Sequence, residues 1–207
     1  MSWFLIGAQT KLATNSNWPI KLKDKELLLR PLRFRDKRAW DLSRSNNREW
    51  LTPWEATLPR VPAGSPASEF VSKRPSFFEM VHALNREARA GRSYSFLIWK
   101  GENLIGQITL GGVIYGALRA GHIGYWIDRN FANRGYTTQA VTLLSSFGFS
   151  ELGLHRIEIN VRPENAASCK VAEKAGFTFE GHRKAFLHID GAWRDHVSFV
   201  KYNELIQ

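Results

Sequence analysis

The order in which hydrophobic periodicity changes along the chain is the feature that most restricts its fold. The runs follow one another as a strand, a helical insertion, three strands, a helix, a strand, a helix and two strands. That order fits neither a doubly wound sheet nor an all-β sandwich, so it predicts an α/β chain of the α+β type. Strands are expected at 25–33, 94–99, 103–110, 122–128, 156–161, 177–187 and 192–202, and helices at 34–45, 76–90, 136–152 and 165–175.

Turn and breaker residues divide these elements and indicate the domain organisation. Residues 46–66 are rich in Trp and Pro and are expected to be a loop with one short helical turn, while 111–121 is expected to be a Gly-rich loop. Residues 1–20 show little periodicity and are expected to be an irregular lead-in. At roughly 100–200 residues per domain, the 207 residues predict a single domain over 1–207, with 34–90 as the helical insertion.

Composition excludes several classes of protein. With 43% apolar and 13% aromatic residues, the chain is not expected to be disordered. Cys169 is the only cysteine, which excludes a disulfide framework and a cysteine-rich zinc site and favours a reducing compartment. No apolar run approaches the ~18–20 residues of a membrane span, and residues 1–20 do not resemble a secretory signal. We therefore expect a cytoplasmic protein with no metal and no membrane association.

The charge balance points to an anionic partner. The chain has 29 Lys+Arg against 19 Asp+Glu, a formal net charge of +10. Such an excess suits a nucleotide cofactor, an acidic protein or RNA. The alternative is a solvated basic surface without a specific ligand.

The segment Trp126–Thr138 joins an expected strand to an expected helix and carries the first candidate site. Its centre, Asn133-Arg134-Gly135, places a glycine and a cationic donor beside the first helical turn. Backbone N–H groups there have no helical partner, and the helix dipole adds positive potential, so a pyrophosphate suits the position. The alternative is an ordinary strand-to-helix turn. The segment is neither a P-loop nor a dinucleotide fingerprint, because the required glycines and the Gly-Lys-Ser/Thr run are missing.

The second candidate segment opens the helix expected at 165–175. Asn165 and Ser168 lie three residues apart at its start and can face the same way. The alternative interpretation is a capping pair, in which the Asn165 side chain accepts a hydrogen bond from the Ser168 amide.

These segments and their surroundings together resemble the GNAT superfamily, the acetyl-CoA-dependent N-acetyltransferases, and more closely its ribosomal-protein alanine acetyltransferase branch (RimJ/RimL type). The resemblance covers about Leu27 to Tyr202. It implies a central mixed, mostly antiparallel sheet of about seven strands, flanked by helices and splayed at the acetyl-CoA site. The supporting motifs are Gly124–Ile127, Asn133–Ala140, Gly153–Glu158, Arg162–Ser168, Glu173–Phe177, Glu180-Gly181 and Asp190–His196.

The chain departs from the family pattern at two places. The phosphate loop of relatives usually reads Gln/Arg-x-x-Gly-x-Gly/Ala, whereas Ala132 and Thr137 stand at its first and last positions here and only Gly135 matches. Many members also carry a tyrosine as general acid at the position of Ala172. In the Rim-type pattern the serine of an Asn-x-x-Ser run approaches the cofactor sulfur, so Ser168 is the expected proton or hydrogen-bond donor to the leaving thiolate.

The resemblance also implies the remaining site residues. Backbone N–H groups around Trp126–Asp128 are expected to bind the thioester oxygen and the pantetheine arm, and Asn165 to orient the pantetheine amides. The candidate general bases are His122, Glu158 and His188, and the tryptophans of the insertion, Trp40, Trp50 and Trp54, are either core or one wall of the acceptor cleft. Arg134, Arg162, Lys170 and Lys174 are candidates to neutralise the CoA phosphates. The full set expected at the cofactor is Trp126, Ile127, Asp128, Asn133, Arg134, Gly135, Tyr136, Thr137, Thr138, Asn165 and Ser168.

The implied reaction is direct acetyl transfer from acetyl-CoA to a neutral amine. The leading acceptor is the N-terminal α-amine of a protein, with a ribosomal protein and ribosome association as the family expectation. Two alternatives stay open: a small-molecule or antibiotic amine acetyltransferase, and a non-catalytic RNA- or ribosome-binding module. The sequence leaves the oligomeric state open between monomer and homodimer.

Overall fold

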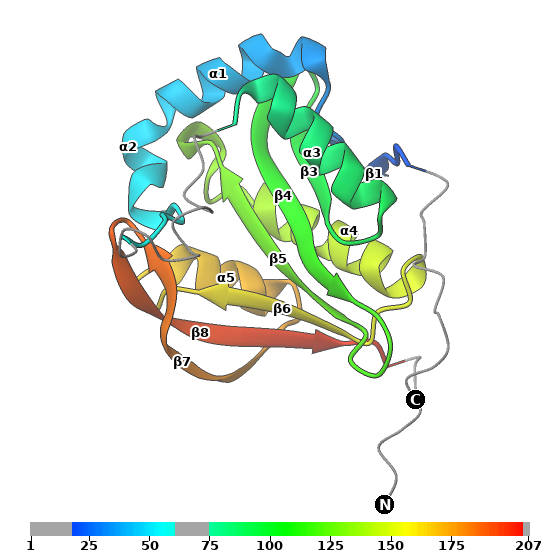
Figure 1. Ribbon diagram of the computed structural model, residues 1–207, viewed down its shortest axis with the longest axis vertical. Helices are drawn as coiled ribbons and strands as arrows, with labels where there is room; N and C mark the ends of the chain where they lie inside the picture. The colour runs from blue at the N-terminus through cyan, green and yellow to red at the C-terminus, as the bar shows by residue number, and fades with distance from the viewer. Residues whose placement is uncertain (1–17, 61–74, 205–207) are drawn as a thin grey trace, which may run out of the picture.

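Eight strands form one mixed sheet in the order β1-β2-β3-β4-β5-β6-β8-β7 (Figure 1). The computed structural model describes residues 18–60 and 75–204. Neighbouring strands run antiparallel except β5 and β6, which are parallel. The strands are β1 Leu22–Asp24, β2 Leu27–Arg30, β3 Tyr94–Lys100, β4 Asn103–Ile114, β5 Ala120–Ile127, β6 Arg156–Val161, β7 Thr178–Ile189 and β8 Ala192–Tyr202.

Helices cover both faces of the sheet. In Figure 1, α1 and α3 lie in front of the strands and α4 and α5 lie behind them. The helices are α1 Lys37–Asn46, α2 Arg48–Leu51, α3 Phe77–Arg89, α4 Tyr136–Ser150 and α5 Ala166–Lys174, with 3-10 turns η1 Phe34–Asp36, η2 Thr52–Trp54 and η4 Arg129–Phe131. The fold class and the mixed, mostly antiparallel sheet predicted above are confirmed.

The strand count and two boundaries differ from the prediction. The strand expected at 25–33 is β2, and an unexpected strand, β1, precedes it and pairs with it. Lys25 adopts a left-handed backbone (φ 49°) where the chain reverses between the two. The sheet therefore has one strand more than expected. The Gly-rich stretch 111–121 is mostly strand, since β4 continues to Ile114 and β5 begins at Ala120.

The two layers of helices enclose two apolar clusters of different size. The larger lies between the sheet and α4, where Phe147 packs edge-to-face on Tyr94 and Phe96 of β3. The smaller lies on the other face, where Leu97 of β3 packs with Val81 of α3 and with Leu32, which follows β2. Side chains of a strand alternate between faces, so β3 is buried on both. No helix in the described part of the chain is long and apolar enough to cross a bilayer.

The cap considered at Asn165 is present, and the structure adds a cap at the start of α3 that was not predicted. Ser76 and Glu79 form a reciprocal capping box at the start of α3. Asn165 caps α5 by accepting a hydrogen bond from the Ser168 amide at 3.0 Å. The second interpretation given above for the Asn165–Ser168 pair is therefore observed. The prolines at 62 and 66, and the lead-in up to residue 17, lie outside the described residues.

A buried ion pair joins the end of β2 to η1. Arg30 donates to both carboxylate oxygens of Asp36, at 2.6 and 2.8 Å, and its guanidinium stacks 4.3 Å from the ring of Trp99. The Arg33 amide adds a third hydrogen bond to Asp36. Burial alone raises the pKa of Asp36, but the bonds from Arg30 and Arg33 outweigh it and hold the pKa below its usual value.

We expect Asp36→Ala to lower the free energy of unfolding by about 3–5 kcal/mol, since removing one partner leaves a buried charge uncompensated. Asp41→Ala, which removes the exposed partner of Lys37, is the matched control and should change it by less than about 1 kcal/mol. Urea unfolding at pH 7 measures both. Because the folded pKa of Asp36 is depressed, its contribution should be present at neutral pH and lost as the pH falls through the folded pKa. Equal effects of the two variants would contradict the assignment.

Candidate active site

β5 and β6 separate after a short stretch of pairing. Their ladder joins Ala120, Gly121 and His122 of β5 to Arg156, Ile157 and Glu158 of β6, and does not continue in the described structure. Beyond it, β5 still pairs with β4 as far as Ile127, and β6 pairs with β8 as far as Val161. The sheet therefore opens between β5 and β6 toward the carboxyl ends of both strands.

The backbone of β5 presents polar groups to this opening. The Asp128 amide donates to the Ile105 carbonyl at 2.7 Å, so it points toward β4. In a trans peptide the carbonyl of the preceding residue points the opposite way, so Ile127 O faces the opening. In an extended strand the N–H and C=O of one residue point to the same side, and the side alternates from one residue to the next. The backbone N–H and C=O of Tyr125 and of Ile127 therefore face the opening. This corrects the expectation for Trp126 and Asp128, whose amides are directed to β4.

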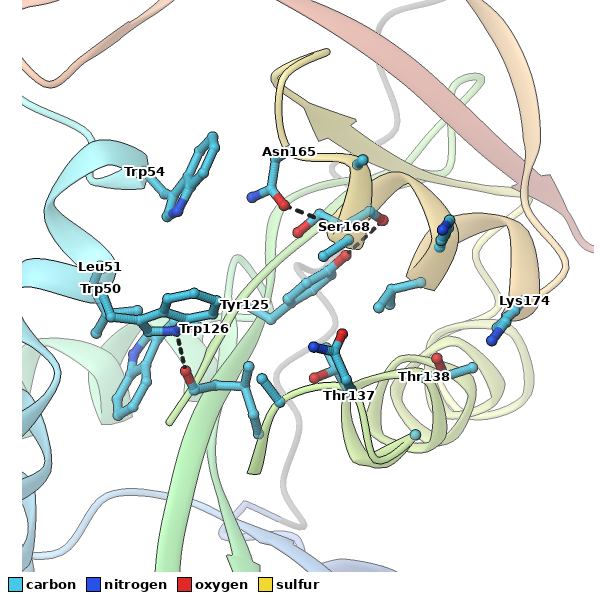
Figure 2. A pocket seen from close by; sticks show the side chains of 18 of the residues that line it. Trp50, Leu51, Trp54, Tyr125, Trp126, Thr137, Thr138, Asn165, Ser168 and Lys174 are labelled. Carbon is cyan, nitrogen blue, oxygen red and sulfur yellow. Dashed lines mark hydrogen bonds between the residues drawn. The ribbon is translucent and has the colours of Figure 1, made fainter. Parts of the chain in front are cut away.

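A cavity of about 620 Å³ occupies the opening (Figure 2). Its walls come from α2 and η2 on one side, β5 on the floor, the start of α4, and the first turns of α5. Most of the residues expected at the cofactor line it. They are Trp126, Ile127, Asn133, Gly135, Thr137, Thr138, Asn165 and Ser168, together with Trp50, Leu51, Trp54, Tyr125, Ala132, Glu164, Ala166, Ala167, Lys170, Val171 and Lys174.

The start of α4 forms one end of this cavity. Gly135 is the N-cap of α4 and has a left-handed backbone (φ 82°), which a residue with a Cβ adopts with strain. A Cβ at Gly135 would have no neighbouring atom within 4 Å, so the backbone is open on that side. The first backbone N–H groups of α4, a 15-residue helix, point out of its N-terminus beside Gly135. Thr137, at a position that departs from the family's phosphate-loop pattern, is buried and lines the cavity.

A second, more open cavity of about 480 Å³ continues past the start of α4. Arg134 and Tyr136 line it, as expected, and so does Lys174 of α5. Lys25 and Glu26, from the turn between β1 and β2, complete this wall. Lys25 was missed by sequence reasoning, because nothing local distinguishes it from the other lysines of this region and the hairpin itself was not predicted.

At the other end of the first cavity, α5 brings two side chains to the opening. Ser168 and Asn165 both line it, and only Oδ1 of Asn165 is used in the cap, which leaves the amide nitrogen on the side of Trp54 (Figure 2). Tyr125 of β5 reaches across to the same place, and its hydroxyl donates to the Ser168 carbonyl at 3.3 Å. Tyr125 belongs to a motif quoted above, but no sequence signal assigned it a role.

Residues 47–57, here called the strap, close the cavity on the side of α2 and η2. Asn47 is buried and binds Asp128 Oδ2 at 2.7 Å and the Arg129 amide at 2.8 Å. Trp50 donates its indole N–H to Ile127 O at 3.1 Å. The Asp128 carboxylate is therefore a structural acceptor, and Asp128 does not line either described cavity.

The second half of the strap is hydrogen-bonded to Arg162, which follows β6, and to the β7–β8 hairpin. Arg162 donates to Pro53 O at 2.8 Å and lies 5.2 Å from the ring of Trp54. Thr57 N donates to His188 O at 2.9 Å. Arg162 is thus occupied in holding the strap and does not line either cavity, contrary to its expected role at the phosphates. His188, a candidate base, binds Thr57 through its ring as well.

The other two candidate bases lie side by side and away from the cavity. His122 and Glu158 are register partners where β5 and β6 are still paired, on the face opposite the α4 core. Arg156 Nε binds one oxygen of Glu158 at 3.0 Å and Arg183 binds the other at 2.6 Å. Desolvation of the His122 ring lowers its pKa, so the imidazole is neutral at pH 7. Neither residue lines the described cavities.

A splayed β-sheet, a helix N-terminus at one end of the opening and a serine at the other reproduce the arrangement that the sequence motifs implied. The family model described as "Acetyltransferase (GNAT) domain" matches residues 26–178. The chain belongs to the GNAT acetyltransferase family. As a member, it is an N-acetyltransferase that uses acetyl-CoA as cosubstrate.

Individual relatives agree with this assignment. Mycobacterium smegmatis RimJ, solved in complex with CoA-disulfide, is 35% identical, with a TM-score of 0.79 over 91% of this chain and 90% of that one. The uS5-alanine N-acetyltransferase of Escherichia coli K12 is 29% identical over 88% of this chain and 91% of its own length. Bacillus subtilis YjcK is 44% identical over 46% of this chain, and the match spans 52% of that protein, about half its length.

We expect Gly135→Asp to weaken CoA binding by about 10–100-fold, as when one charge-assisted hydrogen bond is lost. The carboxylate would project where the α4 amides point, and it would repel a phosphate. Isothermal titration with CoA measures the affinity. Gly116→Asp is the matched control, because Gly116 has a similar backbone (φ 77°) and equally open surroundings in the β4–β5 turn. Equal affinities of the two variants for CoA would refute an anion site at α4.

Proposed function

We propose that this enzyme acetylates the N-terminal α-amine of a protein, with a ribosomal protein as the acceptor. The observation that carries the chemistry is the opening between β5 and β6, where backbone donors of β5 face Ser168 across a cavity with an anion site at its other end. The acceptor class is supported by the relatives, since the proteins from Escherichia coli and Vibrio fischeri are alanine acetyltransferases of ribosomal proteins uS5 and S5.

Each part of the cavity has a task in this reaction. The CoA pyrophosphate binds the amides at the start of α4, and Arg134, Lys174 and Lys25 offset its charge. The pantetheine arm runs along the β5 backbone, where the Ile127 and Tyr125 groups face it. The N–H groups of this strand stabilise the thioester oxygen as it gains charge. The acceptor amine approaches from the strap side, between Trp50 and Trp54.

The amine must lose a proton, and the described site holds no strong base beside Ser168. At pH 7 roughly one α-amine in ten is neutral, against under one lysine in a thousand, because their pKa values lie near ~7.7–8.0 and ~10.4. An α-amine therefore needs only water or a remote base. Arginines hold both oxygens of Glu158, and Thr57 binds the ring of His188, so His122 is the remaining candidate among the predicted bases. It does not line the cavity and would act through water.

We expect a peptide with a free N-terminal alanine and one internal lysine to be modified at the terminus at pH 7. Tandem mass spectrometry locates the acetyl group. The same peptide with its terminus already acetylated is the control and should remain unmodified on the lysine. Because only the neutral α-amine reacts, kcat/KM for the peptide should rise with pH and level off above about 8. Preferential lysine acetylation at pH 7 would refute the α-amine proposal.

We propose Ser168 as a hydrogen-bond or proton donor to the departing sulfur. A contact made only as the C–S bond breaks changes kcat and leaves cofactor binding nearly unaltered. Ser168→Ala should therefore lower kcat by ~10–1,000-fold. The Kd for acetyl-CoA should change by less than about tenfold, the equivalent of a typical net hydrogen bond. Rapid-quench kinetics and calorimetry measure the two quantities.

Asn165→Ala separates this role from capping. Asn165 is the observed cap, so its loss should reduce stability by about 0.5–2 kcal/mol. Ser168 uses only its backbone N–H in the cap, so Ser168→Ala should leave the Tm near that of the wild type. An unchanged kcat of Ser168→Ala in an assay limited by chemistry would exclude Ser168 from the mechanism.

A further inference from the structure

The cavity holds a second hydroxyl at the end where α5 begins. Four hydroxyl-bearing side chains line it: Tyr125, Thr137, Thr138 and Ser168. The two threonines belong to the first turn of α4, at the anion site. Tyr125 and Ser168 lie at the opposite end, where the β5 backbone and the start of α5 face each other (Figure 2). Two hydroxyl donors therefore reach the end of the cavity that receives the thioester.

The environment of Tyr125 suits a donor more than a structural tie. Tyr125 presents both its backbone N–H and C=O and its side chain to the opening. Within the described residues, its hydroxyl bonds to Ser168 O at 3.3 Å, longer than the 2.5–3.0 Å usual for an O–H···O bond. Such a bond is weak, and a small rotation of the hydroxyl redirects it toward the cavity. Tyr125 and Ser168 both line this end of the cavity, so a sulfur bound there lies beside both residues.

We propose that the Tyr125 hydroxyl donates a hydrogen bond to the departing CoA sulfur, beside Ser168, and so stabilises the thiolate. This inference rests on the acetyl transfer proposed above. The amine nitrogen forms the new C–N bond, the C–S bond breaks, and its electron pair leaves on sulfur. Tyr125 keeps its proton. The proton lost by the amine passes to water, and the thiolate takes a proton from water.

The ionisation of Tyr125 is consistent with this role. Burial raises the pKa of its hydroxyl well above the usual value. The phenol therefore stays protonated at every pH at which the amine reacts, and it can donate throughout. It is a poor acid for complete proton transfer to a thiolate, which is why the role assigned to it is a hydrogen bond.

The first test compares Tyr125→Phe, Ser168→Ala and the double variant. Tyr202→Phe is the matched control, because its hydroxyl binds Arg156 and Glu180 outside the site. Tyr125→Phe should lower kcat by about 10–100-fold, as expected for one donor to a developing charge, and leave the KM for acetyl-CoA within about twofold. If the two hydroxyls serve one sulfur, the double variant should lose more than the product of the single losses. An unchanged kcat, or a loss confined to KM and Tm, would overturn the proposal.

The second test needs no acceptor and no turnover. A donor at the sulfur stabilises the thiolate of bound CoA, so it lowers the pKa of that thiol. Ultraviolet titration of the thiolate in the enzyme–CoA complex should show this pKa about one unit higher in Tyr125→Phe than in the wild type, the shift expected for one net hydrogen bond. Tyr202→Phe should match the wild type. Equal pKa values in Tyr125→Phe and the wild type would overturn the proposal, whatever the identity of the acceptor.

The kinetic test uses thiol release with whichever amine the wild type acetylates. A wild-type enzyme that modifies lysine but not an α-amine would refute the proposed acceptor and leave the comparison of Tyr125 variants intact. The site of acetylation on the peptide therefore tests the α-amine proposal, and the comparison of Tyr125 variants tests the role of Tyr125.

Discussion

The separation of β5 from β6 is the constraint on which the rest of the site depends. Each strand is held more firmly by its antiparallel neighbour than by the other: β5 follows β4 to Ile127, and β6 follows β8 over its whole length. Their own parallel ladder ends at His122 and Glu158. Once the strands part, the polar backbone groups of Tyr125 and Ile127 face a cavity in place of a neighbouring strand. Trp50 donates to the Ile127 carbonyl, and the proposed function assigns the backbone groups of this strand to the pantetheine arm.

The strap turns that opening into an enclosed site. It is tied to the sheet at separate points, through Asn47 to Asp128, through Pro53 to Arg162 and through Thr57 to the β7–β8 hairpin. Trp50 caps the Ile127 carbonyl from this side. These polar contacts hold two large aromatic side chains, Trp50 and Trp54, at the edge of the cavity. The packing of a short irregular segment thereby limits the room left for an acceptor.

The excess of positive charge has two distinct uses. Lys25, Arg134, Lys170 and Lys174 line the two cavities, where the proposed function places the anionic cosubstrate. Arg156 and Arg183 instead bind Glu158, and Arg162 holds the strap. The formal charge of +10 therefore reflects both a ligand site and ion pairs that position strands, and the net value alone does not separate them.

Local patterns in the sequence predicted most of the helices and strands and the starts of α4 and α5. The periodicity of 136–152, the left-handed glycine before it and the Asn165 cap each depend on neighbouring residues, so the anion site and the exposed start of α5 could be predicted from them. The motifs then indicated the family. Register and facing were decided by the tertiary structure, because they depend on partners far along the chain. The amide of Asp128 bonds to β4. Lys25 lines the second cavity because an unpredicted hairpin places it there. His122 pairs with Glu158 where β5 and β6 are still joined. The contact between Tyr125 and Ser168 depends on the tertiary structure for the same reason. The β4–β5 and β6–β8 ladders set which face of the sheet Tyr125 occupies and where β5 separates from β6.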